Sequence, residues 1–355
     1  MAKEIVGLKL GASRLTAARL TVNGSAELLQ LAEAPLPRGV IAAGEVRDVP
    51  ALAAALKEFF KKHKLPRRNV RVGVANNRIG VRTIEVAGID DPKQLGNAVR
   101  FRAQEVLPIP IDDAVLDFQV LSEGADSEGV ATRRVLLVVA YRDLVAGYVE
   151  ACRQAGLRLA GVDLEAFALL RALTPGDAGG AAALERSALV AVSIGADRSV
   201  LAVSDGFSCE FTRVLDWGGN ALTVAVGRAL ELEIDEAERV KIALALQGEG
   251  VPEGLAPERA VQGREALQLA LKGFGRELLS SLQFYQGQPD SLGIREIVLA
   301  GGTAQLTGLA VELQRLVGVP VRIGDPLAGV SLGKKLKGET PNPSHTVPIG
   351  LGMAV

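Results

Sequence analysis

The alternation of apolar and polar residues divides the chain into short strands, turns and amphipathic helices. An apolar strand at residues 6–10 is followed by an apolar stretch at residues 15–22, which ends at the common hairpin turn Asn23-Gly24. The same layout returns at residues 190–194 and 199–204, before Asp205-Gly206. The pattern therefore predicts that each half of the chain opens with a β-hairpin.

The two hairpins also resemble each other residue by residue. Residues 6–14 read VGLKLGASR and residues 190–198 read VAVSIGADR, an offset of 184 positions. Four residues are identical, and Val6, Gly11, Ala12 and Arg14 return as Val190, Gly195, Ala196 and Arg198. This repeat indicates a duplicated fold, with a domain boundary in the featureless Gly- and Ala-rich stretch at 174–183.

The remaining pattern predicts an α/β fold of two domains and a small insert. In the first half we expect helices at 51–64 and 144–155 and strands at 69–74, 81–86 and 158–163. The predicted α+β insert contains a helix that begins at Asp91-Pro92, carries Leu95, Val99, Arg102 and Val106 and stops before Pro108. Strands at 114–121 and 133–141 follow it. In the second half we expect helices from 235, at 264–286 and at 309–317, strands at 296–300 and 319–323, and mostly loop at 325–347.

These elements give the expected domain limits. Residues 1–84 and 142–180 form the first domain, to which 346–355 is expected to return, residues 85–141 form the insert, and residues 184–345 form the second domain.

Composition and charge narrow the class of protein. Lys plus Arg is 40 and Asp plus Glu is 41, so the net charge is −1, which argues against a bulk nucleic-acid binder. Two cysteines and the absence of a signal sequence or a long apolar run favour a reducing, cytoplasmic setting without membrane insertion. The basic run from Lys57 to Arg68 is interpreted as a solvated helix end.

Several segments resemble a known family in their order along the chain. They are residues 45–52 (EVRDVPAL), 99–110 (VRFRAQEVLPIP), 115–121 (VLDFQVL), 218–223 (GGNALT), 236–241 (EAERVK), 281–285 (SLQFY) and 298–303 (VLAGGT). With the duplicated hairpins, the chain resembles the actin-like ATPases, and more closely the PilM family of type IV pilus assembly, with FtsA as its nearest cousin. The resemblance implies an actin-like fold of two halves around a nucleotide cleft.

The resemblance implies that ATP or ADP can bind between the two hairpins. Glycine permits close approach of the backbone to phosphates, and short neighbours supply N–H and hydroxyl donors. The implied nucleotide-binding residues are Lys9, Gly11, Ala12, Ser13, Arg14, Gly195, Ala196, Asp197, Gly219, Glu238, Lys241, Gly301, Gly302 and Thr303. The alternative interpretations are plain turns at the hairpin glycines and a tight strand-to-helix connection at Gly301.

Two positions depart from the active relatives. Those relatives place a metal-facing acid two residues before each hairpin glycine, where this chain has Lys9 and Ser193. Mg²⁺ is therefore disfavoured, and we expect a degenerate ATPase rather than an efficient enzyme, with no confident catalytic residue and no metal site. Lys9 could instead neutralise a phosphate directly, or simply extend out of a hairpin edge.

Two acidic residues have both a functional and a local interpretation. Glu165 matches the water-orienting position of the superfamily, whereas Asp163 could cap the helix that starts there, with Glu165 as a first-turn acid. Glu238 shares a helix face with Lys241 but is also spaced from Asp235 as in a capping box. Both alternatives stay open on the sequence alone.

The resemblance implies a scaffold at the cytoplasmic face of the inner membrane. Its implied partner is the cytoplasmic amino-terminal tail of a PilN-like membrane protein, with other pilus components and self-association as further contacts. Phe101, Leu107 and Ile109 are the candidate peptide groove, although Phe101 could be a second core face and the three could merely seal the insert. The alternative functions are an active actin-like ATPase and an FtsA-like, membrane-associated division protein.

Overall fold

Two large mixed sheets repeat the same strand order. The first has six strands in the order β10-β6-β1-β2-β3-β16, and the second has five in the order β13-β12-β11-β14-β15. Apart from β16, each sheet joins three antiparallel strands to two parallel ones in matching positions. The computed structural model describes residues 3–89, 91–106, 110–125, 129–174, 187–247, 250–289, 291–336, 338 and 340–354. The sequence repeat is therefore also a repeat of the fold.

The first sheet is built around the first predicted hairpin. Its strands are β1 (Lys3–Leu10), β2 (Arg14–Asn23), β3 (Ser25–Pro35), β6 (Val70–Val74), β10 (Leu159–Leu164) and β16 (Val330–Leu332). One face is covered by α1 (Val49–Lys62) and α3 (Arg142–Gln154), with the short pair β4 (Ile41–Ala42) and β5 (Glu45–Val46) nearby. The predicted hairpin turn is confirmed, because Gly24 joins β2 to β3 with a φ of +74°.

The other face of this sheet carries α4 (Glu165–Leu173) and α9 (Thr346–Met353). The last helix approaches the backbone closely: a Cβ on Gly7 would lie 2.0 Å from Pro348 O, and a Cβ on Gly350 would lie 1.8 Å from Ala168 O. The end of the chain therefore packs on β1 and α4, more than 150 residues away in sequence. The limits of the two domains and of the insert given above remain predictions.

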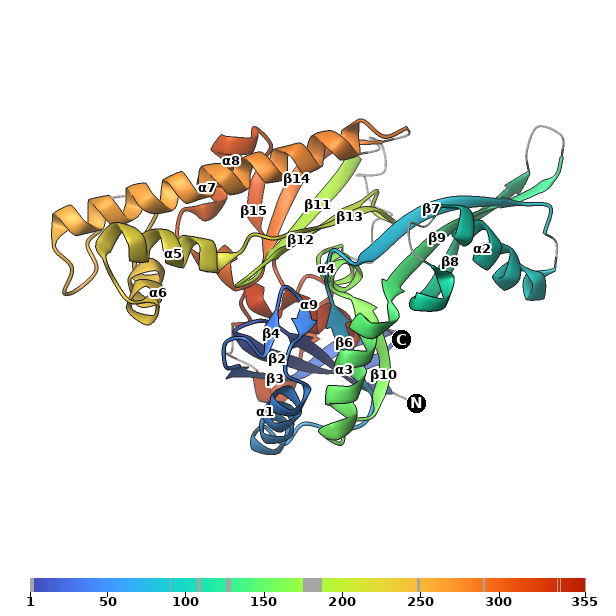
Figure 1. The fold of residues 1–355 in the computed structure, drawn as a ribbon, viewed down its shortest axis with the longest axis horizontal. Coiled ribbons are helices and arrows are strands. Elements are labelled where there is room, and N and C mark those ends of the chain that lie inside the picture. Colours follow the sequence, from blue (N-terminus) through green and yellow to red (C-terminus); the bar gives the residue numbers. More distant parts are fainter. Residues whose placement is uncertain are drawn as a thin grey trace.

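The second sheet has its own core on one face. Its strands are β11 (Ser187–Ile194), β12 (Ser199–Ser204), β13 (Cys209–Leu215), β14 (Gly293–Ala300) and β15 (Val321–Ile323), and its helices are α5 (Gly219–Leu230), α6 (Ile234–Ala243), α7 (Pro257–Gln286) and α8 (Leu309–Val317). Leu267, Leu271, Phe274 and Leu278 of α7 are fully buried. Figure 1 shows α7 running along the outer side of this sheet toward α5 and α6.

A small three-stranded sheet projects from the first half (Figure 1). The sheet has the strand order β7-β9-β8. The whole insert consists of β7 (Ile79–Ala87), α2 (Pro92–Val106), the 3₁₀ turn η1 (Ile111–Asp113), β8 (Ala114–Ala125) and β9 (Ala131–Tyr141). The predicted strand–helix–strand–strand insert is confirmed. Its core takes Leu95, Val99 and Ala103 from α2, whereas Arg102 is exposed and pairs with Glu105.

Two other predicted regions differ from the structure. The helix predicted at 264–286 begins at Pro257, and the tail at 325–347 contains β16 and the 3₁₀ turns η4 (Lys334–Leu336) and η5 (Pro343–His345). β16 pairs in parallel with β3, so this stretch is anchored to the first sheet. Among the described helices, none combines the length and the apolar character that crossing a bilayer requires.

Candidate functional site

A cavity of about 920 Å³ lies between the two halves, at the ends of the strands that lead into the two repeated turns. It is large enough for a nucleotide, since small-molecule sites usually measure roughly 300–1,000 Å³. Every residue predicted to bind nucleotide lines it: Lys9, Gly11, Ala12, Ser13, Arg14, Gly195, Ala196, Asp197, Gly219, Glu238, Lys241, Gly301, Gly302 and Thr303. Glu165 and Ser193 line the same cavity.

The two Gly-Ala-x-Arg turns have matching backbone geometry. Gly11 N donates to Arg14 O at 3.0 Å, and Gly195 N donates to Arg198 O at 2.9 Å. A Cβ on either glycine would meet that carbonyl oxygen at 3.1 Å or 3.0 Å. An added side chain would crowd that carbonyl oxygen, so both turns favour glycine at the position that faces the cavity.

Lys9 crosses the cleft at its base. Its Nζ lies 3.1 Å from Glu165 Oε2 and donates to Ser193 Oγ at 3.5 Å. The Lys9 side chain is only 16% exposed, so the interpretation as a lysine extending out of a hairpin edge is wrong. The ammonium group thus links β1, α4 and β11, where the duplicated strands face each other.

The acidic residue at the start of α4 takes part in this contact. Leu164 is the N-cap of α4, and Asp163 instead accepts from Leu164 N and pairs with Arg171 at 3.1 Å. The alternative that Asp163 caps the helix is therefore wrong. Glu165 is buried, and a first-turn carboxylate is also favoured by the positive end of the helix dipole.

A second buried lysine supports the other side of the cavity. Lys241 Nζ lies 2.6 Å from Glu238 Oε2 and donates to Thr223 Oγ1 at 3.1 Å, while Thr223 donates to Glu238. The N-cap of α6 is Glu233, so the alternative in which Glu238 belongs to a capping box with Asp235 is wrong. Thr223 is a member of this group that the sequence did not single out.

Residues at the two Gly-Gly segments, 218–219 and 301–302, form hydrogen bonds or close contacts with the backbone of the second hairpin. Gly219 N donates to Gly195 O at 2.9 Å, and Thr303 Oγ1 donates to the same oxygen at 3.0 Å. Gly301 has a φ of +86°, and a Cβ there would lie 2.4 Å from Ile194 O. These residues line the cavity and also fix the shape of the turn at 195–198.

The two arginines of the repeat have diverged. Arg14 is half exposed and pairs with Glu33 at 2.5 Å. Arg198 is buried, crosses to the first half and donates from Nη1 to Ala75 O at 3.0 Å. A Cβ on Gly44 would lie 2.4 Å from that nitrogen, so the turn between β4 and β5 needs a glycine to admit the guanidinium.

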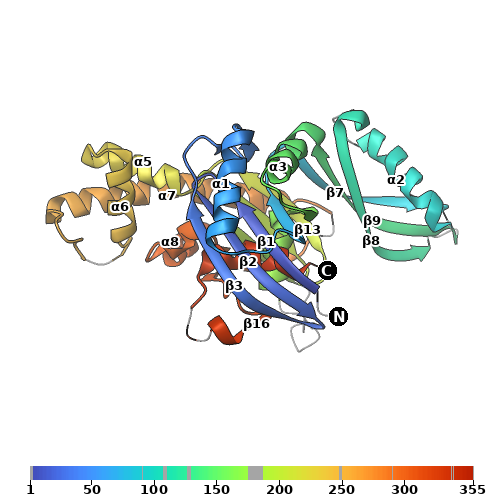
Figure 2. The ribbon, with the colours of Figure 1, turned by 90° about the horizontal axis from the view of Figure 1, so that it is seen from below.

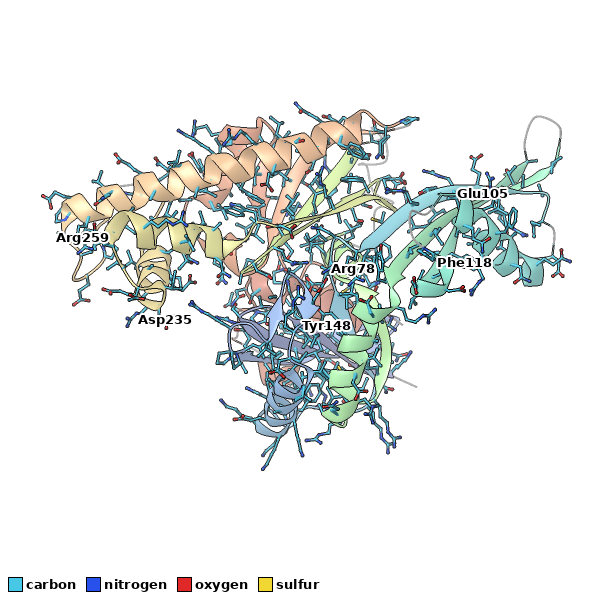
Figure 3. The ribbon with its side chains drawn as sticks, in the orientation of Figure 1. Arg78, Glu105, Phe118, Tyr148, Asp235 and Arg259 are labelled. Atoms are coloured by element: carbon cyan, nitrogen blue, oxygen red, sulfur yellow. The ribbon has the colours of Figure 1, made fainter. Side chains whose placement is uncertain are left out.

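This contact belongs to a wider network between the halves. Asp197 accepts from Ala43 N at 3.1 Å, and Tyr148 donates to Gly44 O at 2.9 Å. Tyr148 lines the cavity, and Figure 3 shows Arg78 above it, near the root of the insert. Sequence reasoning missed this network because the turn at residues 42–44 has no distinctive local pattern; the only signal was the repeat position of Arg198.

Glu33 forms the second ion-pair group at the rim of the cavity. It pairs with His345 Nε2 at 3.0 Å and accepts from Ser344 Oγ at 2.9 Å, in addition to Arg14. The hydrogen bond from His345, followed by those from Ser344 and the charge of Arg14, lowers the pKa of Glu33 to about 2 despite partial burial. The group ties β3 to the turn that precedes α9.

The acidic side chains that line the cavity pair with basic side chains of the protein itself. Among the described residues, no group of three or more His, Cys, Asp or Glu side chains is placed to hold a metal ion. Glu165, the carboxylate nearest the base of the cleft, already pairs with Lys9. Mg²⁺ usually binds through one or two carboxylates together with substrate phosphates and water, so the metal dependence of nucleotide binding is a property to be measured.

The predicted peptide groove is only partly described. Phe101 is 64% exposed on α2, so the alternative of a second core face is wrong. Leu107 and Ile109 lie outside the described residues. A separate small cavity of about 160 Å³ lies at the root of the insert, where Asn77 and Ile79 face Leu164 and Val214.

Comparison with known proteins gives consistent matches over the whole chain. The family model described as type IV pilus assembly protein PilM matches residues 7–355. The solved PilM–PilN type IV pilus biogenesis complex contains a chain 27% identical to this one, with 99% of both chains covered and a TM-score of 0.81. The cell division protein FtsA of Neisseria meningitidis serogroup B is 23% identical over 97% of this chain and 88% of its own length.

A more distant structure supports the fold class. MreB5 of Spiroplasma citri bound to ADP is 12% identical, covers 98% of this chain and 94% of its own, and has a TM-score of 0.55. These likenesses confirm the expected actin-like fold, with two halves around a cleft and a small insert.

Proposed function

The chain belongs to the PilM family of actin-like type IV pilus assembly proteins, and from that premise we propose that it is a scaffold. In this proposal it binds ATP or ADP in the cleft without a divalent metal and hydrolyses it weakly or not at all. It is held at the cytoplasmic face of the inner membrane by the amino-terminal tail of a PilN-like protein.

The observation that carries the nucleotide part is the position of Lys9. Its ammonium lies between Glu165 and Ser193, at the base of the cavity that both hairpins line. Lys9 contributes +1 and Glu165 contributes −1, so this base is neutral without an added cation. The ammonium of Lys9 can then donate to a nucleotide phosphate, while Glu165 offsets its charge.

The same contact argues against efficient hydrolysis. A metal orients the leaving and attacking oxygens in phosphoryl transfer, and an ammonium group is a point charge that cannot hold several oxygens in a fixed geometry. Glu165, the matching water-orienting residue, is buried and already paired. Nucleotide would then act as a structural ligand that joins the two halves.

The partner part rests on the family and on the exposed surface of the insert. The matched solved structure is a PilM–PilN complex, and in this chain the insert presents Phe101 on α2 and the edge strand β8. An edge strand offers free backbone groups with which an extended peptide can pair, and an exposed aromatic side chain can anchor one of the peptide's apolar residues. The small cavity beside Asn77 and Ile79 could take a second one.

Calorimetry with ATP and with ADP tests the nucleotide part. We expect binding that changes little between Mg²⁺ and EDTA, with negligible phosphate release over many hours. A large loss of affinity on chelation, or steady turnover, would show that another acid such as Asp197 recruits the metal, and would favour the active-ATPase alternative.

Peptide titration tests the partner part. We expect the wild-type chain to bind a synthetic PilN-like amino-terminal tail, with weaker binding by Phe101→Ala and Ile109→Asp. Phe207→Ala is the matched control, because Phe207 is 84% exposed on the β12–β13 turn of the other half. Unchanged affinity in both insert variants would move the groove elsewhere, and no binding by the wild type would remove the adaptor function.

A further inference from the structure

Eight exposed cations gather at one end of the first sheet. Some lie in the last two turns of α1, and others lie just before or at the first residues of three strands. They are Lys3, Lys57, Lys61, Lys62, Lys64, Arg67, Arg68 and Arg158, here called the basic end.

Strand pairing places these residues side by side. β6 pairs in parallel with both β1 and β10, so the three strands begin at the same edge of the sheet. Arg158 N donates to Arg67 O at 2.7 Å, and Val70 N donates to Arg158 O at 3.2 Å. α1 ends at Lys62 and β6 begins at Val70, so the short connection keeps the final lysines of α1 near this edge.

The basic end lies opposite the nucleotide cavity. Gly11, Ala75 and Glu165, at or just beyond the carboxyl ends of the same three strands, line that cavity or its base. Five residues of β6 separate the two edges, about 17 Å of extended chain. The basic end is therefore a separate surface from the cleft.

The charges of the basic end are not balanced locally. None of the eight takes part in an ion pair within the described residues, whereas the acids nearby are engaged: Glu4 with Arg19, and Glu150 with Arg153. Glu58 is the exposed acid left on this part of α1. Because the whole chain has a net charge of −1, this concentration of positive charge is local.

We propose that the basic end binds the anionic surface of a phospholipid membrane. Clusters of four to eight Lys or Arg side chains on one surface are typical of proteins that bind anionic lipid headgroups. Phe59 and Phe60 are buried at 2% and 1% exposure, so this end has no aromatic platform on which unpaired bases could stack. No large apolar side chain between residues 57 and 71 is exposed to anchor a peptide.

The proposal fixes an orientation. With the basic end on the membrane, the nucleotide cavity faces away from the lipid, and the insert extends to the side of the first sheet (Figure 2). Binding through exposed side chains is electrostatic, so it depends on lipid charge and weakens as salt screens it. It does not need a partner protein or a nucleotide.

Vesicle sedimentation with the full chain alone tests this proposal. We expect binding to vesicles of phosphatidylcholine mixed with phosphatidylglycerol, little binding to phosphatidylcholine alone, and loss of binding as salt rises from about 0.1 M to about 1 M. The triple variant Lys61→Gln/Lys62→Gln/Arg67→Gln should bind at least tenfold more weakly, since each basic residue contributes separately near an anionic surface.

The control removes the same charge from the other half. Arg239, Lys272 and Arg276 are exposed on α6 and α7, and the triple variant to Gln should bind vesicles like the wild type. Thermal melting establishes that both variants are folded. Equal binding of all three proteins, or equal binding to neutral vesicles, would overturn the proposal.

A competition experiment distinguishes binding to lipid from binding to nucleic acid. Duplex DNA should displace the chain from the vesicles only weakly. Tighter binding to DNA than to anionic vesicles, lost in the Lys61, Lys62 and Arg67 variant, would assign the basic end to nucleic acid and overturn the lipid assignment. Nucleotide affinity, measured in parallel, should be unchanged in this variant, so failure here is distinct from failure of the scaffold proposal.

Discussion

Lys9 lies between the two halves of the chain, with its ammonium 3.1 Å from Glu165 Oε2 and 3.5 Å from Ser193 Oγ. In the proposed mode of nucleotide binding, this one side chain takes the place of a metal-facing acid and of the charge that a metal would bring. The result is a cleft whose base is neutral without a divalent ion. The consequence for ligand binding can be tested by restoring the acids.

The first prediction is that Lys9→Asp/Ser193→Asp makes nucleotide binding dependent on Mg²⁺. Three carboxylates, including Glu165, would then face the phosphates, and like charges repel ATP unless a metal intervenes. We expect calorimetry to show at least tenfold weaker ATP binding in EDTA than in Mg²⁺, a ratio that the wild type lacks.

Lys9→Met is the control for this prediction. It removes the positive charge without adding a carboxylate, so affinity should fall while the ratio between Mg²⁺ and EDTA stays near one. If the double Asp variant binds ATP equally in both conditions, the base of the cleft does not face the phosphates.

The second prediction concerns the pH dependence of stability at Glu33. Hydrogen bonds from His345 and Ser344 lower the pKa of Glu33 from 4.5 to about 2 in the folded chain. A lowered pKa favours folding above the unfolded value, so this stabilisation is present above pH 4.5 and is lost as pH falls toward 2. Because Glu33 is partly exposed, its contribution is on the order of 1 kcal/mol.

Thermal denaturation of Glu33→Gln across pH should reveal this contribution. The variant should melt a few degrees below the wild type at neutral pH, and the difference should shrink between pH 4.5 and 2. Glu85→Gln, at an exposed position of β7, is the control and should follow the wild-type curve. A constant difference at all pH values would mean that the charge of Glu33 is not the stabilising factor.

At the scale of elements, α9 packs closely against the first sheet and α4 because glycines at the contact carry no side chain. A Cβ on Gly350 would lie 1.8 Å from Ala168 O, and a Cβ on Gly352 would lie 2.4 Å from the side chain of Leu20 on β2. Seven residues of this short helix are buried, so it forms part of the core rather than a surface element.

The third prediction compares two glycines in helices. Gly350→Ala should destabilise the chain by about 2 kcal/mol or more, because α9 must move away from the backbone of α4. Gly273→Ala in α7 meets nothing within 4 Å and should be neutral or stabilising by about 0.5–1 kcal/mol. Chemical denaturation measures both, and equal midpoints would contradict the packing of α9 described here.

The elements show where sequence reasoning succeeds and where it stops. The hairpins were predictable because alternating apolar residues end in turn dipeptides, and Gly206 has the positive φ that such a turn needs. The predicted start of α7, at residue 264, lies after the observed start at Pro257. The reason is that the first turns bury the small residues Ala260 and Gly263 rather than a stripe of large apolar side chains. Phe101 shows the same limit, since its spacing alone did not tell exposure from burial.

The residues of the candidate site likewise fall into those that the sequence predicts and those that it does not. Residues in repeated or glycine-rich motifs were found, because local chemistry marks them. Thr223, Glu33 and the crossing of Arg198 to Ala75 were not, because each depends on a partner brought near by folding. Local pattern predicts the ligand-facing turns, and the tertiary fold adds the residues that hold them.

At the scale of the molecule, one apolar cluster spans both halves, in addition to the separate core of the second sheet. Leu169 of α4 belongs to the same buried cluster as Val200 of β12 and Val298 of β14, and α4 contacts β12 directly. Arg38 also pairs with Asp235 across the outer side of the cleft at 2.7 Å. The halves are therefore joined by a core and by surface contacts, as well as by the chain itself.

The fourth prediction is that the first half cannot fold without the end of the chain. A fragment of residues 1–178 lacks α9, whose Ile349 and Leu351 are fully buried in the intact chain. The apolar side chains of β1 and α4 that α9 covers would then be exposed. We expect this fragment to aggregate when expressed alone. Coexpression with residues 184–355 should give a one-to-one complex, because α9 and the shared core then return to their places.

A rescue experiment distinguishes the role of α9 from that of the whole second half. Residues 1–178 joined through a flexible linker to 346–355 should recover solubility, at least in part, because α9 is supplied without the second sheet. A stable monomer of 1–178 with a cooperative melting transition would contradict the prediction. Failure of the linked chain, with success of the coexpressed pair, would instead show that the first half depends mainly on Val200, Val298 and their neighbours in the shared core.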